Sequence, residues 1–122
     1  MSINKYTCSG NLTRDAEERV TNGGMTILSF TVAVNDRRKN PQNGEWQDYP
    51  NYVPCVMFGK RAEAIAGYMK KGVKVCIEGK IRQSKWESDG ETRSKIEVVI
   101  DEIELMSRQA QPIMTNNDEI PF

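Results

Sequence analysis

The chain has 122 residues, and its 17 lysines and arginines balance 17 acidic residues, a length that suits one compact domain. Hydrophobic residues make up 38% and charged residues 28% of the chain, and the mean hydropathy is −0.63. No apolar run reaches the roughly 18 residues of a membrane-spanning helix, so we expect a soluble protein with no membrane partner. The first residues also lack the apolar segment of a secretory signal, so we expect a cytoplasmic location.

The composition excludes several kinds of active site. The chain contains no histidine, so Ser-His-Asp triads, Cys-His pairs and the usual His-containing zinc sites cannot form. Cys8, Cys55 and Cys76 are widely spaced and form no CxxC motif, which argues against a disulfide framework. Neither a phosphate-binding loop nor a dinucleotide-binding fingerprint is present. Chemistry by carboxylates alone stays open, but we predict a binding protein with no catalytic residues, no metal and no cofactor.

Alternating apolar residues predict two strands in the first third of the chain. Residues 5–12 have the period of a half-buried strand. The polar residues 13–21 then end in a turn at Asn22-Gly23-Gly24. Residues 25–35 form the clearest strand pattern, and its expected core face holds Leu28, Phe30, Val32 and Val34.

Residues 36–48 are basic at their start and rich in turn residues, so we expect a long hairpin loop that exposes Trp46 at its tip. Residues 49–58 predict the returning strand. Its expected core face holds Val53, Cys55 and Met57, and its outward face holds Tyr52, Pro54, Val56 and Phe58. Because Pro50 and Pro54 lack an N–H, this strand is expected at an edge or with a bulge.

The period changes at residue 60. Ala62, Ile65, Ala66 and Met69 predict one short amphipathic helix over residues 60–69, with Gly72 after its end. Alternation returns at Val73, Val75, Ile77, Gly79 and Ile81 in a strand that reaches Trp86. Asp89-Gly90 predicts a two-residue hairpin turn. The last strand is expected to supply Ile96, Val98 and Ile100 to the core.

The order of three strands, one helix and two strands predicts an all-β fold with one short helix. It fits the five-stranded Greek-key barrel of the OB-fold. An SH3-like barrel competes, but it needs no helix at residues 60–69. We expect this domain to span residues 1–106 and to be followed by a flexible, polar tail at residues 107–122.

Aromatic and basic side chains alternate where the strands are expected to face outward. Trp86 follows Arg82 and Lys85, and Phe58 precedes Lys60, while Tyr52 and Trp46 come after the basic residues 37–39. Unpaired bases stack on aromatic rings while cations contact phosphates, so this mixture is typical of single-stranded nucleic-acid binding. At roughly 1–3 kcal/mol per stacked base, three or four rings would hold a strand whatever its sequence.

Each of these residues also has a structural interpretation. Phe58 lies beside Met57 and Val56, so packing in the core competes evenly with stacking. Tyr52 could equally pack beneath a loop. Trp46 and Trp86 occupy polar surroundings that favour binding, with a subunit contact as the alternative. A basic run such as residues 37–39 is most often only a solvated face.

The C-terminal end combines two acids, two apolar residues, and an aromatic residue at the chain's own carboxylate. These residues are Asp118, Glu119, Ile120, Pro121 and Phe122. A polar tail rarely finishes in this way, and such an end can dock on a partner as a short peptide. We therefore predict a partner-binding tip.

Taken together, these segments resemble the bacterial and phage single-stranded DNA-binding protein family. The resemblance runs from about residue 3 to residue 106, and the acidic Ile-Pro-Phe end matches separately. The matching segments are residues 10–12 (GNL), 22–24 (NGG), 58–63 (FGKxAE, in which residue 61 is not part of the match), 68–72 (YMKKG), 77–81 (IEGKI) and 85–86 (KW).

The resemblance implies an OB-fold that assembles as a homotetramer and wraps single-stranded DNA in replication, recombination and repair, in the cytoplasm at the nucleoid. It also implies that replication and repair proteins dock on the C-terminal tip. By motif it implies stacking at Tyr52, Phe58 and Trp86, and phosphate contacts at Arg19, Lys60, Lys71, Arg82 and Lys85. We add Trp46 to the stacking residues and Arg37 and Arg38 to the phosphate contacts.

The sequence departs from the family pattern at several positions. Tyr52 stands where many members have tryptophan, and Arg38 stands where another family tryptophan aligns, a loss for which we expect Trp46 to compensate. Val53 replaces a histidine that helps the subunit contact in some members, Pro54 replaces a basic residue, and the tail is short. An oligomeric adaptor that works mainly through protein contacts, and an RNA-binding OB module, remain alternative functions.

Overall fold

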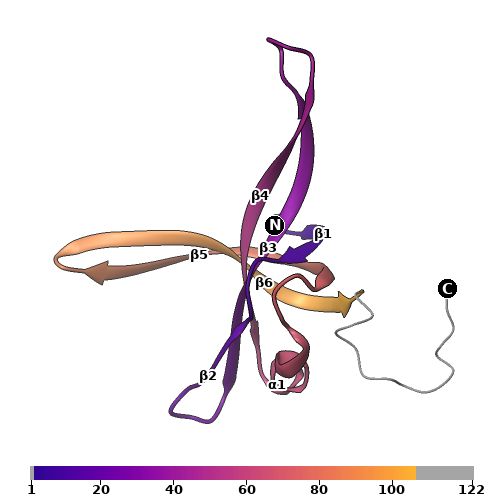
Figure 1. Ribbon diagram of the computed structural model, residues 1–122. Helices are drawn as coiled ribbons and strands as arrows, with labels where there is room; N and C mark the ends of the chain where they lie inside the picture. The colour runs from indigo at the N-terminus through magenta and orange to yellow at the C-terminus, as the bar shows by residue number, and fades with distance from the viewer. Residues whose placement is uncertain (1, 107–122) are drawn as a thin grey trace, which may run out of the picture.

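The computed structural model describes residues 2–106, in which six strands, one short α-helix and one 3-10 helix are formed (Figure 1). The strands are β1 (Tyr6–Leu12), β2 (Glu17–Val20), β3 (Thr26–Lys39), β4 (Trp46–Phe58), β5 (Lys74–Ser88) and β6 (Glu91–Leu105). The helix α1 (Lys60–Ile65) and the 3-10 helix η1 (Ala66–Tyr68) connect β4 to β5. Among the described residues, no helix has both the length and the apolar composition needed to cross a bilayer.

Five of the strands close into a barrel. Each strand is paired with the next in the order β1, β5, β6, β4, β3, and β1 also pairs with β3 through Asn11 and Leu12, which closes the ring. The pairing of β4 with β6 is parallel and short, at Cys55↔Val98 and Val56↔Val99. The predicted five-stranded OB-type barrel with one short helix is confirmed. The strand β2 is added to β3 outside the ring.

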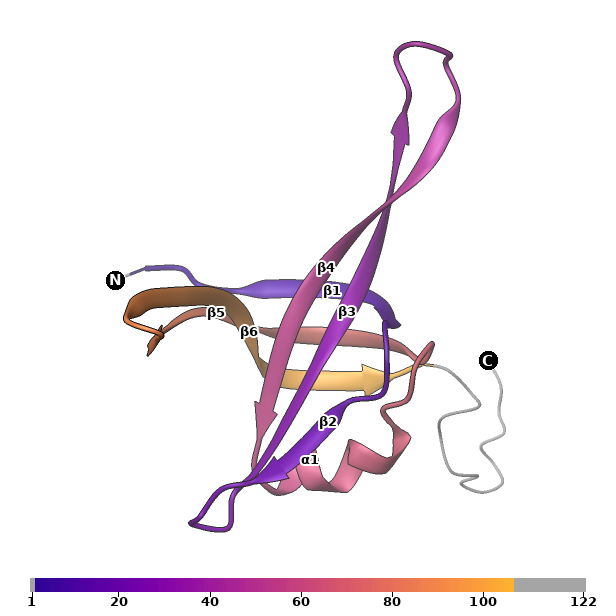
Figure 2. The same cartoon turned by 60° about the vertical axis from the view of Figure 1, so that its left-hand side comes forward.

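The barrel is filled by apolar side chains from all five strands. Leu28, Val32, Val75 and Ile77 have at most 1% of their surface exposed, and Phe30 is 5% exposed. Met69, which follows η1, is also buried in this cluster. Figure 2 shows α1 lying across the lower end of the barrel, where it covers this core. Two glycines allow the strands to approach, because a Cβ at Gly10 or Gly79 would collide with the carbonyl oxygen of Ala33 or Val99.

Two hairpins extend beyond the barrel in different directions (Figures 1 and 2). We call residues 36–49 the β3–β4 arm and residues 82–97 the β5–β6 arm. The second arm turns at Asp89 and Gly90, whose φ angles of 54° and 79° are those of the predicted two-residue turn.

The prediction of a loop over residues 36–48 is wrong. The strand β3 continues to Lys39 and β4 begins at Trp46, so only residues 40–45 connect them, and Trp46 lies opposite Lys39 in the ladder. The sequence there has no apolar face, but the backbone ladder persists. Cross-strand contacts support it, including Arg37 Nε to Asp48 Oδ1 at 3.8 Å.

Other element predictions need smaller corrections. The polar stretch at residues 13–21 contains β2, whose side chains are all exposed and whose formation rests on backbone pairing with β3. The helix predicted over residues 60–69 changes at Ala66 into a 3-10 turn. Ile96, predicted in the core, is 57% exposed, and Ile81, the last apolar residue of the predicted alternation, is 43% exposed, because both lie where the two strands have left the barrel.

Candidate nucleic-acid interface

Three of the predicted stacking rings project from one face of β4. Trp46, Tyr52 and Phe58 are separated by six residues each, and an even spacing places side chains on the same side of a strand. Trp46 is 59% and Tyr52 is 64% exposed, whereas Phe58 is half-buried where β4 ends. The face therefore has a row of rings that begins on the exposed β3–β4 arm and ends at the barrel.

Phe58 and Trp86 line one cleft of about 590 Å³ between the end of β4 and the β5–β6 arm. Trp86 is 44% exposed, and the guanidinium carbon of Arg82 lies 5.5 Å from the centre of the Phe58 ring, a distance at which cation and ring attract. The other lining residues are Arg19, Ile27, Ser29, Val56, Ser84, Lys95 and Glu97. Val56 is on the outward face as predicted and lines this cleft, although it is only 5% exposed.

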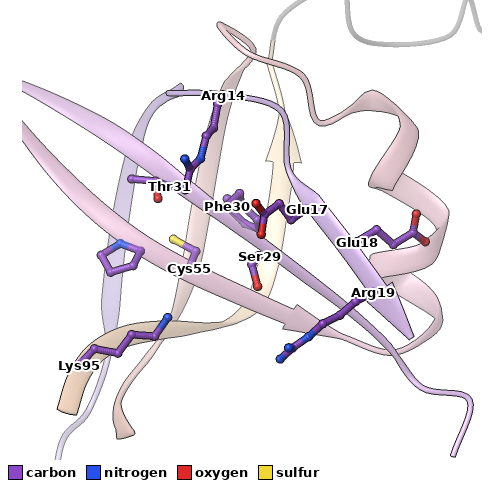
Figure 3. Close-up of a pocket in the computed structure, with 10 residues that line it drawn as sticks. Arg14, Glu17, Glu18, Arg19, Ser29, Phe30, Thr31, Cys55 and Lys95 are labelled. Carbon is purple, nitrogen blue, oxygen red and sulfur yellow. The ribbon is translucent and has the colours of Figure 1, made fainter. Parts of the chain in front are cut away.

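A second cleft of about 550 Å³ adjoins the first and shares Arg19, Ser29 and Lys95 with it. Figure 3 shows Arg14 and Arg19 reaching toward it from the β2 side and Lys95 from β6. The remaining lining residues are Glu17, Glu18, Phe30, Thr31, Pro54 and Cys55. We call the two clefts together the groove. It crosses β3 and β4 on the face that bears the aromatic rings.

The groove holds one buried carboxylate. Glu97 is 7% exposed, and its Oε2 accepts hydrogen bonds from Arg82 Nη2 at 2.7 Å and from Ser84 Oγ at 3.0 Å. Lys95 Nζ lies 3.5 Å from Oε1. Burial by itself raises the pKa of Glu97, but the two hydrogen bonds and the charges of Lys95 and Arg82 outweigh it, so the pKa is lowered. The carboxylate is therefore ionised at neutral pH.

The groove is suited to binding and not to nucleophilic chemistry. Burial raises the pKa of the Cys55 thiol to about 12, with smaller effects from Cys8 and Glu97, so the thiol is protonated at neutral pH. Within residues 2–106, no group of three or more Cys, Asp or Glu side chains is placed to hold a metal ion. The groove offers aromatic rings, hydroxyl groups and cations.

The remaining predicted phosphate contacts are dispersed over the molecule. Arg37 is on the same face of the β3–β4 arm as Trp46, but Arg38 is on the opposite face, with its guanidinium carbon 4.0 Å from the centre of the Tyr49 ring. Lys85 pairs with Ser94 on the opposite face from Trp86. Lys60 begins α1 and Lys71 lies in the turn before β5; both are exposed and neither lines the groove.

Several groove residues were not singled out from the sequence, including four that carry charges or polar contacts of the groove. They are Arg14, Ser84, Lys95 and Glu97. A signal for three of them exists in the sequence, because the two-residue turn at Asp89-Gly90 fixes the register of the hairpin. That register pairs Arg82 with Glu97 and Ser84 with Lys95. The predicted partner-binding tip, Asp118 to Phe122, lies outside the described residues.

Comparison with known proteins places the chain among single-strand binding proteins. The model of the single-strand binding protein family matches residues 3–106. A single-stranded DNA-binding protein of Borreliella burgdorferi is 38% identical over 120 residues, which cover 97% of this chain and 79% of that protein. One of Treponema pallidum is 38% identical over 104 residues, which cover 85% of this chain but only 58% of that protein.

Two solved structures are similar to the fold. A deletion mutant of the single-stranded DNA-binding protein from Thermus aquaticus has a TM-score of 0.75 and 28% identity, covering 89% of this chain and 53% of that chain. The Plasmodium falciparum SSB, in a structure described as a complex with ssDNA, has a TM-score of 0.77 at 18% identity. It covers 88% of this chain and 97% of that one, and at this identity it supports the fold alone. The family match and the relatives agree that the chain belongs to the single-strand binding protein family.

Proposed function

We propose that this protein binds single-stranded DNA without reading its base sequence, and that it does so in replication, recombination and repair. As a member of its family it is a binding protein and not an enzyme. The observation that supports the proposal best is the cleft in which Phe58 and Trp86 lie with Arg19, Arg82 and Lys95. Bases stack on the rings while cations of the groove such as Arg19 contact phosphates.

The β3–β4 arm extends this surface. Trp46 and Tyr52 follow Phe58 on the same face of β4, so a strand leaving the cleft along β4 meets two further rings. The chain as a whole has no net charge, so long-range attraction to DNA is weak and the affinity depends on local cations and on stacking. Arg37 lies beside Trp46 on this face of the arm, whereas Arg38, Lys60, Lys71 and Lys85 contact phosphates only if the strand leaves this face and wraps around the molecule.

A titration with oligo-dT tests the proposal directly. Both tryptophans, Trp46 and Trp86, belong to the proposed binding face, so stacking of bases is expected to change the intrinsic tryptophan fluorescence at low salt. Affinity for labelled oligo-dT is measured in parallel by anisotropy. Absence of both a fluorescence change and a rise in anisotropy at low salt would contradict the proposal. Equal or tighter binding of the matching oligo-U would favour an RNA-binding module instead.

The variant Trp86→Ala tests the cleft itself. Loss of one stacking ring is expected to weaken oligo-dT binding by about 10-fold to 100-fold, since each stacked base contributes roughly 1–3 kcal/mol. Tyr68→Ala is the matched control, because Tyr68 is a ring of similar exposure, 40%, in η1 and outside the groove. The same loss in both variants, or in neither, would contradict a role for the cleft.

The wider cellular role rests on the resemblance of the C-terminal tip. Replication and repair proteins dock on Asp118, Glu119, Ile120, Pro121 and Phe122, while the barrel assembles as a homotetramer in the cytoplasm at the nucleoid. Deletion of residues 118–122 is expected to remove partner binding and leave the affinity for oligo-dT in place. If the deletion abolishes function while Trp86→Ala has no effect, the protein is an adaptor that works through protein contacts.

A further inference from the structure

The groove that we propose for DNA contains a buried negative charge in addition to the exposed Glu17 and Glu18, although an anionic ligand would be expected to exclude one. Glu97 lies beside the cations of the cleft, and its carboxylate is one of two buried polar side chains among the described residues. A buried carboxylate is retained at low cost only when its oxygens are paired and hydrogen-bonded. Arg82, Ser84 and Lys95 supply that pairing.

The contacts of Glu97 determine where Arg82 lies. Arg82 Nη2 donates to Glu97 Oε2 at 2.7 Å, and the guanidinium is thereby held against the Phe58 ring at 5.5 Å. Lys95 is two residues from Glu97 on the same face of β6, with its amine 3.5 Å from the other carboxylate oxygen. One carboxylate therefore fixes the two cations that flank the aromatic floor of the cleft.

Arg19 has a different environment. It lines the same cleft from β2, but within residues 2–106 no ion pair or hydrogen bond involves its side chain. A phosphate can therefore pair with Arg19 without displacing another partner, whereas the charges of Arg82 and Lys95 are partly neutralised by Glu97 before DNA arrives. The groove thus contains paired cations at its aromatic floor and an unpaired cation at its β2 side.

We propose that Glu97 is a positioning residue that holds Arg82 against Phe58 and keeps the aromatic floor from acting as a phosphate site. The floor then contacts bases, and phosphates are held by unpaired cations such as Arg19. This inference rests on the proposed binding of single-stranded DNA. It predicts that the salt dependence of binding is shallower than the number of cations in the groove implies, because only unpaired cations release counterions from the DNA.

Comparison of two arginine variants tests the inference without altering Glu97. Affinity for oligo-dT is measured by anisotropy over a range of salt concentrations for the wild type, Arg19→Gln and Arg82→Gln. Arg19→Gln is expected to reduce the slope of log affinity against log salt by ~0.7, the value for one phosphate contact on a single strand. Arg82→Gln is expected to weaken binding at all salt concentrations with a clearly smaller change in slope. Equal losses of slope in the two variants would overturn the inference.

Removal of the carboxylate provides the reverse test. Glu97→Gln frees Arg82 and Lys95 for phosphates, so the slope is expected to steepen by ~0.7 to ~1.4 for one or two gained contacts. Affinity at low salt is also expected to rise. Glu104→Gln is the matched control, because it removes the same charge from an exposed position of the same strand outside the groove. Arg82→Gln in the Glu97→Gln background should then reduce the slope as fully as Arg19→Gln does.

The outcomes separate this inference from the proposed function. If the wild type does not bind oligo-dT, the proposed function fails. If the wild type binds but a folded Glu97→Gln protein has an unchanged or shallower slope, the function stands and the role of Glu97 is wrong. Thermal unfolding of each variant establishes that it is folded, and the arginine comparison remains decisive if Glu97→Gln does not fold.

Discussion

The carboxylate of Glu97 connects binding with the stability of the fold. Its pKa is lowered, since the hydrogen bonds from Arg82 and Ser84 and the nearby charges outweigh the effect of burial. A group whose pKa is lower in the folded state stabilises that state above its unfolded pKa, here near 4.5, and loses this contribution as the pH falls through the folded pKa.

We therefore expect Glu97→Gln to reduce the free energy of unfolding at pH 7 by ~1 kcal/mol, a small value because Arg82 is half exposed and solvent screens the pair. Below pH 4.5 the stabilities of the variant and the wild type should converge. Urea unfolding at stepped pH measures both. If the free energies of unfolding of the two proteins differ by the same amount from pH 7 down to pH 2, ionisation of Glu97 does not contribute to stability.

At Gly79 the constraint is steric. A Cβ there would collide with the backbone of Val99, next to the irregularity in the pairing of β5 with β6. Gly79→Ala is expected to lower the free energy of unfolding by ~1–3 kcal/mol, as overpacking typically does. Gly67→Ala is the control, since a Cβ at this exposed position in η1 meets nothing within 4 Å and should be neutral or slightly stabilising. Equal stability of the two variants would contradict this account.

Among the elements, the β3–β4 arm is expected to contribute to DNA binding but not to the stability of the fold. Its residues 36–49 add nothing to the buried core, whereas Trp46 lies on its ring-bearing face. Replacement of residues 38–47 by Asn-Gly joins Arg37 to Asp48 through a two-residue turn. We expect the unfolding temperature to change little and the affinity for oligo-dT to fall by about 10-fold, the loss of one stacking ring. Unchanged affinity would show that the arm does not contact DNA.

The elements also differ in how far the sequence predicts them. Strands with one face in the barrel core, such as β3 from Leu28 to Val34, show a clear alternation of core-facing and outward-facing residues in the sequence. The β3–β4 arm and β2 have no buried face. Backbone pairing defines them, and their sequences therefore show no hydrophobic alternation that would predict a strand. Ile81 and Ile96 continue the apolar alternation past the barrel, and no local pattern shows where β5 and β6 leave it.

The candidate site is likewise predicted only in part from the sequence. Trp86 and Phe58 are noticeable in the sequence as rings beside cations, but the structure is needed to bring them into one cleft from β5 and β4. Glu97 and Lys95 look like ordinary surface residues of a charged strand. Only the register of the hairpin, together with the neighbouring β4, shows that Glu97 is buried against Arg82.

For the whole molecule, the exposed isoleucines suggest a surface that assembly covers. Ile81, at the base of the β5–β6 arm, and Ile96, within it, lie on the face that continues from the core. We expect the mass in solution to equal four chains, with and without oligo-dT, and Ile96→Asp to reduce the number of chains in the assembly. Light scattering coupled to size exclusion measures both. A monomeric wild type at micromolar concentration would contradict the proposed tetramer.

The proposed acidic tip gives a further expectation for the full chain. A short tether keeps the local concentration of the tip near the groove high, so the tip should compete modestly with DNA at low salt. A chain that ends at Met106 is then expected to bind oligo-dT more tightly than the full chain, and the difference should shrink as salt increases. Equal affinity of the two chains at low salt would exclude this competition.

The outer edge of β4 has a consequence for how the protein behaves at high concentration. β4 is paired with β3 along its whole length but with β6 only at Cys55 and Val56, so most of its second edge is open. The open edge of a long, exposed strand can pair with a strand of another chain, and such pairing can begin a fibre. Pro50 and Pro54 lie within the ladder to β3. Proline has no N–H to donate, so it fits there only at positions whose N–H would point away from β3, toward the open edge. The open edge of β4 therefore lacks two N–H donors that an added strand would need. This protects the protein from strand-to-strand aggregation, while the aromatic face of β4 stays accessible.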